Sequence, residues 1–141
     1  MIADSSGNLY GTTSGGGANS DGTVFEVAAG THTLSTLVTF NGTNGEEPYA
    51  SLIADANGNL YGTTSGGGAN SGGTVFEIAA GTHTLSTLTS FNGTNGQQPY
   101  ASLIADASGN LYGTTNTGGA NDDGTVFELS PVRLELVSKP A

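Results

Sequence analysis

The feature that most constrains this chain is a sequence repeat with a period of 51 residues. Ile2, Ile53 and Ile104 open successive copies, and residues 2–50 and 53–101 differ at only 8 of 49 aligned positions, without a gap. Self-similarity at a fixed period of this length predicts a repeat architecture, in which each copy is one supersecondary unit that buries its faces against its neighbours. The fold therefore depends on what one copy forms and how the copies pack.

Each copy contains four short segments that favour β-strands. In the second copy they cover residues 49–55, 59–64, 74–79 and 84–91, where Thr, Val, Ile, Tyr and Phe are frequent. Asn57-Gly58, between the first two segments, predicts a tight hairpin because both residues tolerate positive φ. Gly and Asn interrupt the chain too often for helices to form. Four strands in meander order describe one blade of a β-propeller, with a parallel β-helix as the alternative.

The predicted fold is all-β: a β-propeller built from 51-residue four-stranded blades, about three blades per chain. We expect blade 1 at residues 1–42 with a truncated first strand, blade 2 at 43–93, blade 3 at 94–138 with a diverged last strand, and a tail at 139–141. Known propellers have at least about four blades, so we expect closure by homo-oligomerisation. A dimer of six blades is favoured over a trimer of nine. In either ring we expect residues 133–139 to pair with the truncated first strand of the next chain.

The charge of the chain argues against two classes of partner. The 141 residues include 12 acidic and only two basic side chains, Arg133 and Lys139, which gives a formal net charge of −10. Without cations to neutralise phosphates, nucleic-acid binding is not expected, and an anionic membrane surface is disfavoured for the same reason. No apolar run approaches the roughly 20 residues of a membrane span. The absence of cysteine removes disulfides, thiolate metal sites and a cysteine nucleophile from consideration.

The repeat also resembles a known family. The pattern LIxDxxGNLYGTTxxGGxxxxGTVFEL occurs, with small departures, at residues 2–27, 52–78 and 103–129. It resembles the GloVer (Gloeobacter/Verrucomicrobia) tandem repeat of bacterial surface and secreted proteins. The resemblance implies a bacterial protein that is secreted or held at the cell surface, and it implies no catalytic residues. The C-terminal segment SPVRLELVSKPA is unlike the repeat.

The loops of a four-stranded meander suggest where a ligand would bind. The connection between the second and third strands and the connection to the next blade leave a blade on the same side, so residues 14–22, 41–48 and their copies should share one rim. Binding sites in propellers favour such a rim. The candidate rim residues are Asn19, Asp21, Tyr49, Asn70, Tyr100, Asn121, Asp122 and Asp123.

We interpret the chain as a non-catalytic scaffold or binding module that self-assembles, with no cofactor and no metal. One alternative is a carbohydrate-binding propeller lectin that uses the rim tyrosines and asparagines. A second is a hydrolase with Asp122 and Asp123 in a rim carboxylate site. The second copy has Ser71 and Gly72 in place of these two aspartates, so we interpret them as solvated loop charge.

Other motifs have structural interpretations. The segment Asp55–Asn59 resembles half of a calcium loop, but the twelfth position is Gly66 instead of the glutamate that such a loop needs, so we expect an aspartate-capped hairpin. The glycine-rich loop at 14–22 has neither a lysine nor a following helix, which favours a flexible connection over a phosphate site. His32 and His83 are expected in exposed turns. The recurring phenylalanines and tyrosines are expected to pack between blades.

Overall fold

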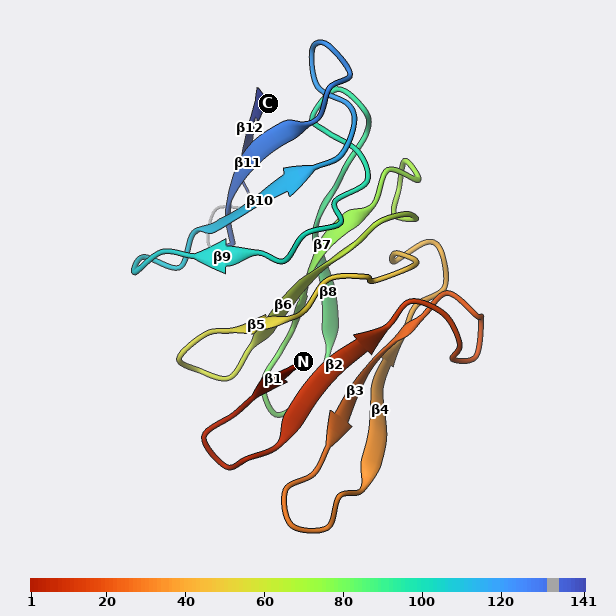
Figure 1. The fold of residues 1–141 in the computed structure, drawn as a ribbon, viewed down its shortest axis with the longest axis vertical. Coiled ribbons are helices and arrows are strands. Elements are labelled where there is room, and N and C mark those ends of the chain that lie inside the picture. The colour runs from red at the N-terminus through yellow and green to blue at the C-terminus, as the bar shows by residue number, and fades with distance from the viewer. Residues whose placement is uncertain (132–134) are drawn as a thin grey trace.

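The computed structural model describes residues 1–131 and 135–141, and over these residues it contains strands and no helix. The strands form three separate four-stranded antiparallel sheets, one from each copy of the repeat. Figure 1 shows the sheets stacked along the long axis of the molecule, the first copy at one end and the third at the other. The prediction of an all-β fold with three four-stranded units is confirmed. The three sheets do not close into a ring.

Within each sheet the strands follow chain order. The first sheet contains β1 (Ile2–Ala3), β2 (Leu9–Thr13), β3 (Thr23–Val27) and β4 (Leu34–Thr39). The second contains β5 (Ile53–Ala54), β6 (Leu60–Thr64), β7 (Thr74–Ile78) and β8 (Leu85–Ser90). The third contains β9 (Ile104–Ala105), β10 (Leu111–Thr115), β11 (Thr125–Ser130) and β12 (Glu135–Pro140). No helix long and apolar enough to cross a bilayer exists in the part of the chain that the structure describes.

The first strand of each sheet is shorter than predicted. We expected a strand over residues 49–55, whereas β5 contains only Ile53 and Ala54, which pair with Tyr61 and Leu60. Within the predicted strand, the carbonyl of Ala50 instead accepts a hydrogen bond from the Thr12 hydroxyl of the first sheet at 3.1 Å, and the preceding residues 42–47 hydrogen-bond to loops of the first and second sheets. Because β1 also has two residues, the first sheet is not truncated relative to the others.

The diverged C-terminal segment forms the last strand of its own sheet. β12 pairs with β11 in register from Ser130↔Glu135 to Thr125↔Pro140, without the bulge that interrupts the β3–β4 and β7–β8 pairs. Two residues of the predicted tail, Lys139 and Pro140, therefore belong to this strand. Residues 135–139 pair with β11 as the outer strand of their own sheet, at the opposite edge from β9. The pairing of 133–139 with the first strand of another chain stays a prediction, because β12 uses only one of its edges for β11. Residues 133 and 134 lie outside the described residues.

The hydrophobic core lies between the sheets. At the joint of the first two sheets, Phe40 and Phe76 are fully buried with ring centroids 5.2 Å apart, and Phe91 and Phe127 repeat the contact at 5.1 Å in the second joint. The prediction that the phenylalanines pack between repeat units is confirmed for these two pairs. The remaining buried residues of the first joint are Val24, Val38, Leu52, Leu60 and Ile78, and those of the second are Tyr61, Val75, Leu103, Leu111 and Leu129.

A glycine in the middle of each second strand makes room for a phenylalanine ring. A Cβ atom on Gly62 would lie 2.6 Å from Cζ of Phe76 and 2.9 Å from a methyl group of Leu52. The first and third sheets repeat this arrangement at Gly11 and Gly113. The Tyr-Gly-Thr sequence of the repeat thus reflects close packing of the ring on the neighbouring backbone.

Candidate ligand-binding rim

The linkers between successive sheets, residues 40–52 and 91–103, contact the glycine-rich loop of the following sheet through backbone hydrogen bonds. Glu46 and Gly66 each donate an amide to the other's carbonyl, at 3.0 and 3.2 Å, and Gln97 and Thr117 do the same at 2.8 and 3.1 Å. The prediction that these two sets of loops share one rim agrees with these contacts. The flexible connection predicted for residues 14–22 stays a prediction. The equivalent loop of the second sheet is held by the preceding linker, and its Ser65 is 3% exposed.

The rim asparagines lie on separate loops. Asn19, Asn70 and Asn121 occupy the same place in the first, second and third sheets, and all three are exposed. The side-chain amide of Asn19 donates to the carbonyl of Phe40 at 3.0 Å, which ties its loop to the end of β4. The side chain of Asn19 is thus used in a structural hydrogen bond. The three asparagines lie on three different loops, one in each sheet.

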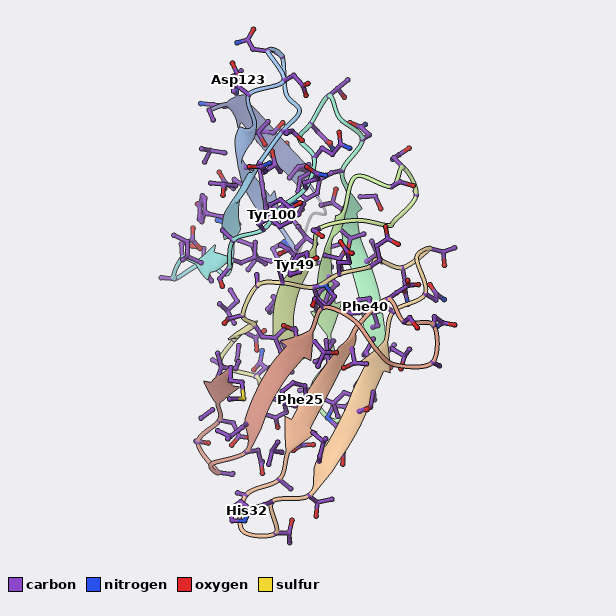
Figure 2. The ribbon with its side chains drawn as sticks, turned by 45° about the vertical axis from the view of Figure 1, so that its right-hand side comes forward. Phe25, His32, Phe40, Tyr49, Tyr100 and Asp123 are labelled. Atoms are coloured by element: carbon purple, nitrogen blue, oxygen red, sulfur yellow. The ribbon has the colours of Figure 1, made fainter. Side chains whose placement is uncertain are left out.

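The structure brings two of the predicted rim residues together. Tyr49 and Tyr100 lie at equivalent places in the two linkers, their ring centroids are 5.7 Å apart, and the planes are tilted by 50°. They are 54% and 45% exposed. Figure 2 shows the two rings near the middle of the molecule, well away from Asp123 at one end and His32 at the other. Glu47 raises the pKa of the Tyr49 hydroxyl, first through its charge and also by accepting a hydrogen bond.

The rim carboxylates do not form a joint site. Asp122 uses Oδ1 to accept the amide of Gly118 at 2.9 Å, so its side chain closes its own loop. Asp21 lies in the first sheet and its backbone carbonyl accepts the amide of Glu47 at 2.9 Å. Asp123 is exposed on the loop of the third sheet. Within the described residues, no group of three or more His, Cys, Asp or Glu side chains is arranged to hold a metal ion.

A second polar cluster, opposite the rim, is a hairpin clasp. Asp55 Oδ1 accepts the amides of Asn57 and Asn59 at 2.9 Å, while Oδ2 accepts the Asn59 side-chain amide at 2.9 Å and the Tyr61 hydroxyl at 3.0 Å. The other two copies repeat these bonds around Asp4 and Asp106. The aspartate therefore caps the hairpin, as predicted, and both of its oxygens are occupied.

The clasp shifts the pKa of both partners. Burial opposes ionisation of Asp55, but the hydrogen bonds from Asn59, Tyr61 and Asn57 outweigh burial and lower its pKa below the usual 3.8. Burial and the hydrogen bond to Asp55 raise the pKa of the Tyr61 hydroxyl to about 12. The tyrosine thus stays protonated and donating, which suits a structural contact better than proton transfer near neutral pH.

The histidines belong to turns. His32 and His83 have φ values of 56° and 54°, and each donates its amide to the alanine four residues earlier. His32 is exposed, as predicted, whereas His83 is half-buried.

Sequence reasoning missed the docking of the linkers on the glycine-rich loops. The contact consists of main-chain bonds, so residue types do not reveal it. The available signal was the recurrence, at a constant offset, of a glycine-containing linker and a glycine-rich loop: 41–45 with 65–68, and 92–96 with 116–119.

Comparisons with known proteins bear on the family and the fold. A family model described as the Gloeobacter/Verrucomicrobia repeat matches residues 1–137. No curated protein matches the chain. The crystal structure of a Bacteroides fragilis protein assigned as a 6-phosphogluconolactonase is similar, with a TM-score of 0.54 and 21% identity, over 92% of this chain and 33% of that chain. The chain spans about a third of the length of that protein, and at this identity the similarity concerns the fold alone.

Proposed function

The chain belongs to the Gloeobacter/Verrucomicrobia repeat family, and from this premise we propose that it is a non-catalytic scaffold module whose end sheets associate with those of identical chains to close a β-propeller. We also propose a secreted or cell-surface location in a bacterium, as the family resemblance implies. One observation supports the assembly proposal: the apolar side chains exposed on the two end sheets are equivalent to side chains that are buried between sheets elsewhere in the chain.

On the first sheet, the exposed apolar residues are equivalents of residues that the internal joints bury. Met1 is 73% and Leu9 37% exposed. The residues one repeat later, Leu52 and Leu60, are 1% and 4% exposed because they pack on the preceding sheet. Leu34, which is 66% exposed, likewise corresponds to Leu85 at the margin of the first joint. The outward face of the first sheet is therefore an unoccupied copy of one side of a joint.

The third sheet supplies the other side of a joint. Val126 is 51% exposed, whereas its equivalents Val24 and Val75 are completely buried against the following sheet. Ile104 is 68% exposed and corresponds to Ile2 and Ile53, which pack at the two internal joints. Grooves beside Val126 are lined by Ile104, Tyr112 and Val137.

A second chain fits these two faces. Each chain has the first-sheet face of a joint at one end and the third-sheet face at the other, so the two faces of different chains can pack together. Contact between unlike faces is head-to-tail, so it forms filaments unless the rotation closes a ring. Burial of apolar surface supplies the driving force, at about 25 cal/mol for each Å² removed from water. The new joint differs from the internal ones at several positions, and the largest difference is the loss of a phenylalanine ring. Ala141 donates its amide to Gly124 at 3.0 Å, as Phe40 does to Gly22, so alanine stands where the internal joints have phenylalanine.

Sedimentation of the purified chain tests the proposal. We expect a discrete species of two or three chains, with Val126→Lys shifting it to one chain and Ala141→Phe raising the associated fraction. Thr31→Lys, in the exposed turn between β3 and β4, is the matched control and should leave the mass unchanged. A folded wild-type sample with the mass of one chain at every concentration would contradict the proposal, as would equal dissociation by both lysine variants.

Carbohydrate binding is the second candidate, and the exposed Tyr49–Tyr100 pair favours it. Two aromatic rings 5.7 Å apart offer a surface on which a sugar ring could stack. Because the chain has no tryptophan, tyrosine dominates its fluorescence, and comparison with a Tyr49 variant assigns the change to this pair among the five tyrosines. We expect neutral oligosaccharides to change the emission of the wild type and not that of Tyr49→Ala; a glycan array without hits would remove this candidate. The hydrolase alternative has no comparable observation, since Asp122 is bonded within its own loop.

A further inference from the structure

In each internal joint, a linker docks on the glycine-rich loop of the following sheet. At the first joint, Gly66 exchanges two backbone hydrogen bonds with Glu46, the amide of Ser65 donates to Glu47 at 3.1 Å, and the amide of Gly68 donates to Gly42 at 2.8 Å. This set of four bonds resembles the addition of a short strand to an open edge. We call residues 65–68 and their equivalents, 14–17 and 116–119, the receiving loops.

The second joint repeats the contact with different side chains. Thr117 exchanges two bonds with Gln97, the amide of Asn116 donates to Gln98 at 3.0 Å, and the amide of Gly119 donates to Gly93 at 2.8 Å. Glutamine replaces glutamate and threonine replaces glycine, yet the pattern of bonds is unchanged. Recognition between linker and receiving loop therefore depends on the backbone.

The receiving loop of the first sheet has the same backbone shape. Gly16 and Gly17 have φ values of 80° and 78°, compared with 70° and 81° at Gly67 and Gly68. The bond from the Gly22 amide to the Gly16 carbonyl, at 3.1 Å, matches the one from Gly73 to Gly67. The conformation is thus already formed, which reduces the entropy that a ligand must overcome on binding.

This loop has no linker on it. Over the described residues, the amides of Ser14, Gly15 and Gly17 have no acceptor, although their equivalents in both other receiving loops do. All four residues of the loop are exposed. A Cβ atom on Gly16 would meet nothing within 4 Å, whereas one on Gly67 would lie 2.7 Å from the carbonyl carbon of Gly45.

We propose that residues 14–17 form a peptide-binding site for an extended linker segment from another repeat of this type, with a glycine at the place of Gly45. The glycine is required because Gly45 has φ of 125° and a Cβ there would lie 2.6 Å from the side chain of Thr64, whose equivalent beside the open loop is Thr13. This inference does not depend on the proposed assembly, because the site lies within one sheet.

The binding test uses amide NMR on the Val126→Lys variant, so that assembly does not interfere. The probe is an 11-residue peptide with the sequence of residues 41–51. We expect saturable shifts at the amides of Ser14, Gly15 and Gly17, and affinity at least about tenfold weaker for the peptide with Gly45→Ala. The chain variant Gly16→Asn should lose binding, since asparagine tolerates positive φ but its side chain occupies the place of the linker.

A covalent version keeps the test decisive if the free peptide binds weakly. In this version the sequence of residues 41–51 is joined to the N-terminus before Met1, because Met1 corresponds to Leu52. The covalent link raises the effective concentration of the peptide at the loop. We expect hydrogen exchange at Ser14, Gly15 and Gly17 to slow at least about tenfold, and Gly16→Asn to abolish the protection. Unprotected amides in this extended chain, or equal affinity of the two peptides, would overturn the proposal. A wild-type chain that stays single while these amides are protected would contradict only the assembly.

Discussion

The pentapeptide Leu-Tyr-Gly-Thr-Thr occurs as β2, β6 and β10, and its three copies have different surroundings. All five residues of β6 are buried, whereas only Gly11 is buried in β2, and only Leu111 and Thr115 in β10. The strands have the same sequence, the same pairing partners and the same register. The difference arises because β6 has a sheet on both sides. Burial of these strands therefore depends on packing between sheets. Equivalent substitutions in the middle and end sheets separate the stability that comes from packing between sheets from the stability that comes from pairing within a sheet.

The largest difference is expected for the phenylalanine of the third strand. Phe76 is completely buried against Phe40, so Phe76→Ala should lower the free energy of unfolding by about 3–5 kcal/mol. Phe25, labelled in Figure 2, is only partly buried in the first sheet, and Phe25→Ala should cost less than half as much. Urea unfolding in the Val126→Lys background measures both. Equal losses would show that the ring is stabilised within its own sheet.

A smaller difference is expected between two receiving-loop glycines. Gly16→Ala should cost about 1–2 kcal/mol, because alanine is strained at positive φ. Gly67→Ala adds a clash with the docked linker backbone, which typically costs a further 1–3 kcal/mol. Thermal unfolding of the two variants checks the prediction. If Gly67→Ala were no worse than Gly16→Ala, the linker would not be held against this loop in solution.

The hairpin clasp predicts a loss of stability in acid. The pKa of Asp55 is lowered in the folded chain, so its contribution is complete above the unfolded value near 3.8 and is lost as the pH falls through the folded pKa. We expect Asp55→Asn to cost about 1 kcal/mol at pH 7 and to flatten the fall in stability below about pH 4. Asp106→Asn, in the exposed clasp of the third sheet, should change the profile less. Parallel pH profiles for the wild type and Asp55→Asn would exclude this role.

The smallest effect concerns the two linkers. The charge of Glu47 raises the pKa of Tyr49, and the second linker has Gln98 in the corresponding place. Glu47→Gln should therefore lower the pKa of Tyr49 with little effect on stability. A pH titration followed through the NMR signals of the Tyr49 ring checks this, because the chain has four other tyrosines that also absorb in the ultraviolet. An unchanged titration would mean that the glutamate does not face the ring.

Much of the fold could be predicted because it depends on local patterns. Asn57-Gly58 and the frequency of strand-favouring residues between Gly and Asn identified the hairpins and the meander, and the period identified the units. The first strand was predicted too long because residues 49–52 favour strand, yet their neighbours bond to another loop. The tyrosine pair was proposed only as two separate rim residues. Their contact depends on how two sheets 51 residues apart are stacked, which residue types alone do not specify.

The sequence by itself determined the number of units, the order of strands, and the aspartate clasp, because each follows from residues close together in the chain. The tertiary structure decided which of the identical residues are buried, which receiving loops hold a linker, and which faces are left open. These properties depend on whether a neighbouring sheet is present. Leu9 and Leu60 have the same side chain and the same strand, but only Leu60 has a sheet packed against it.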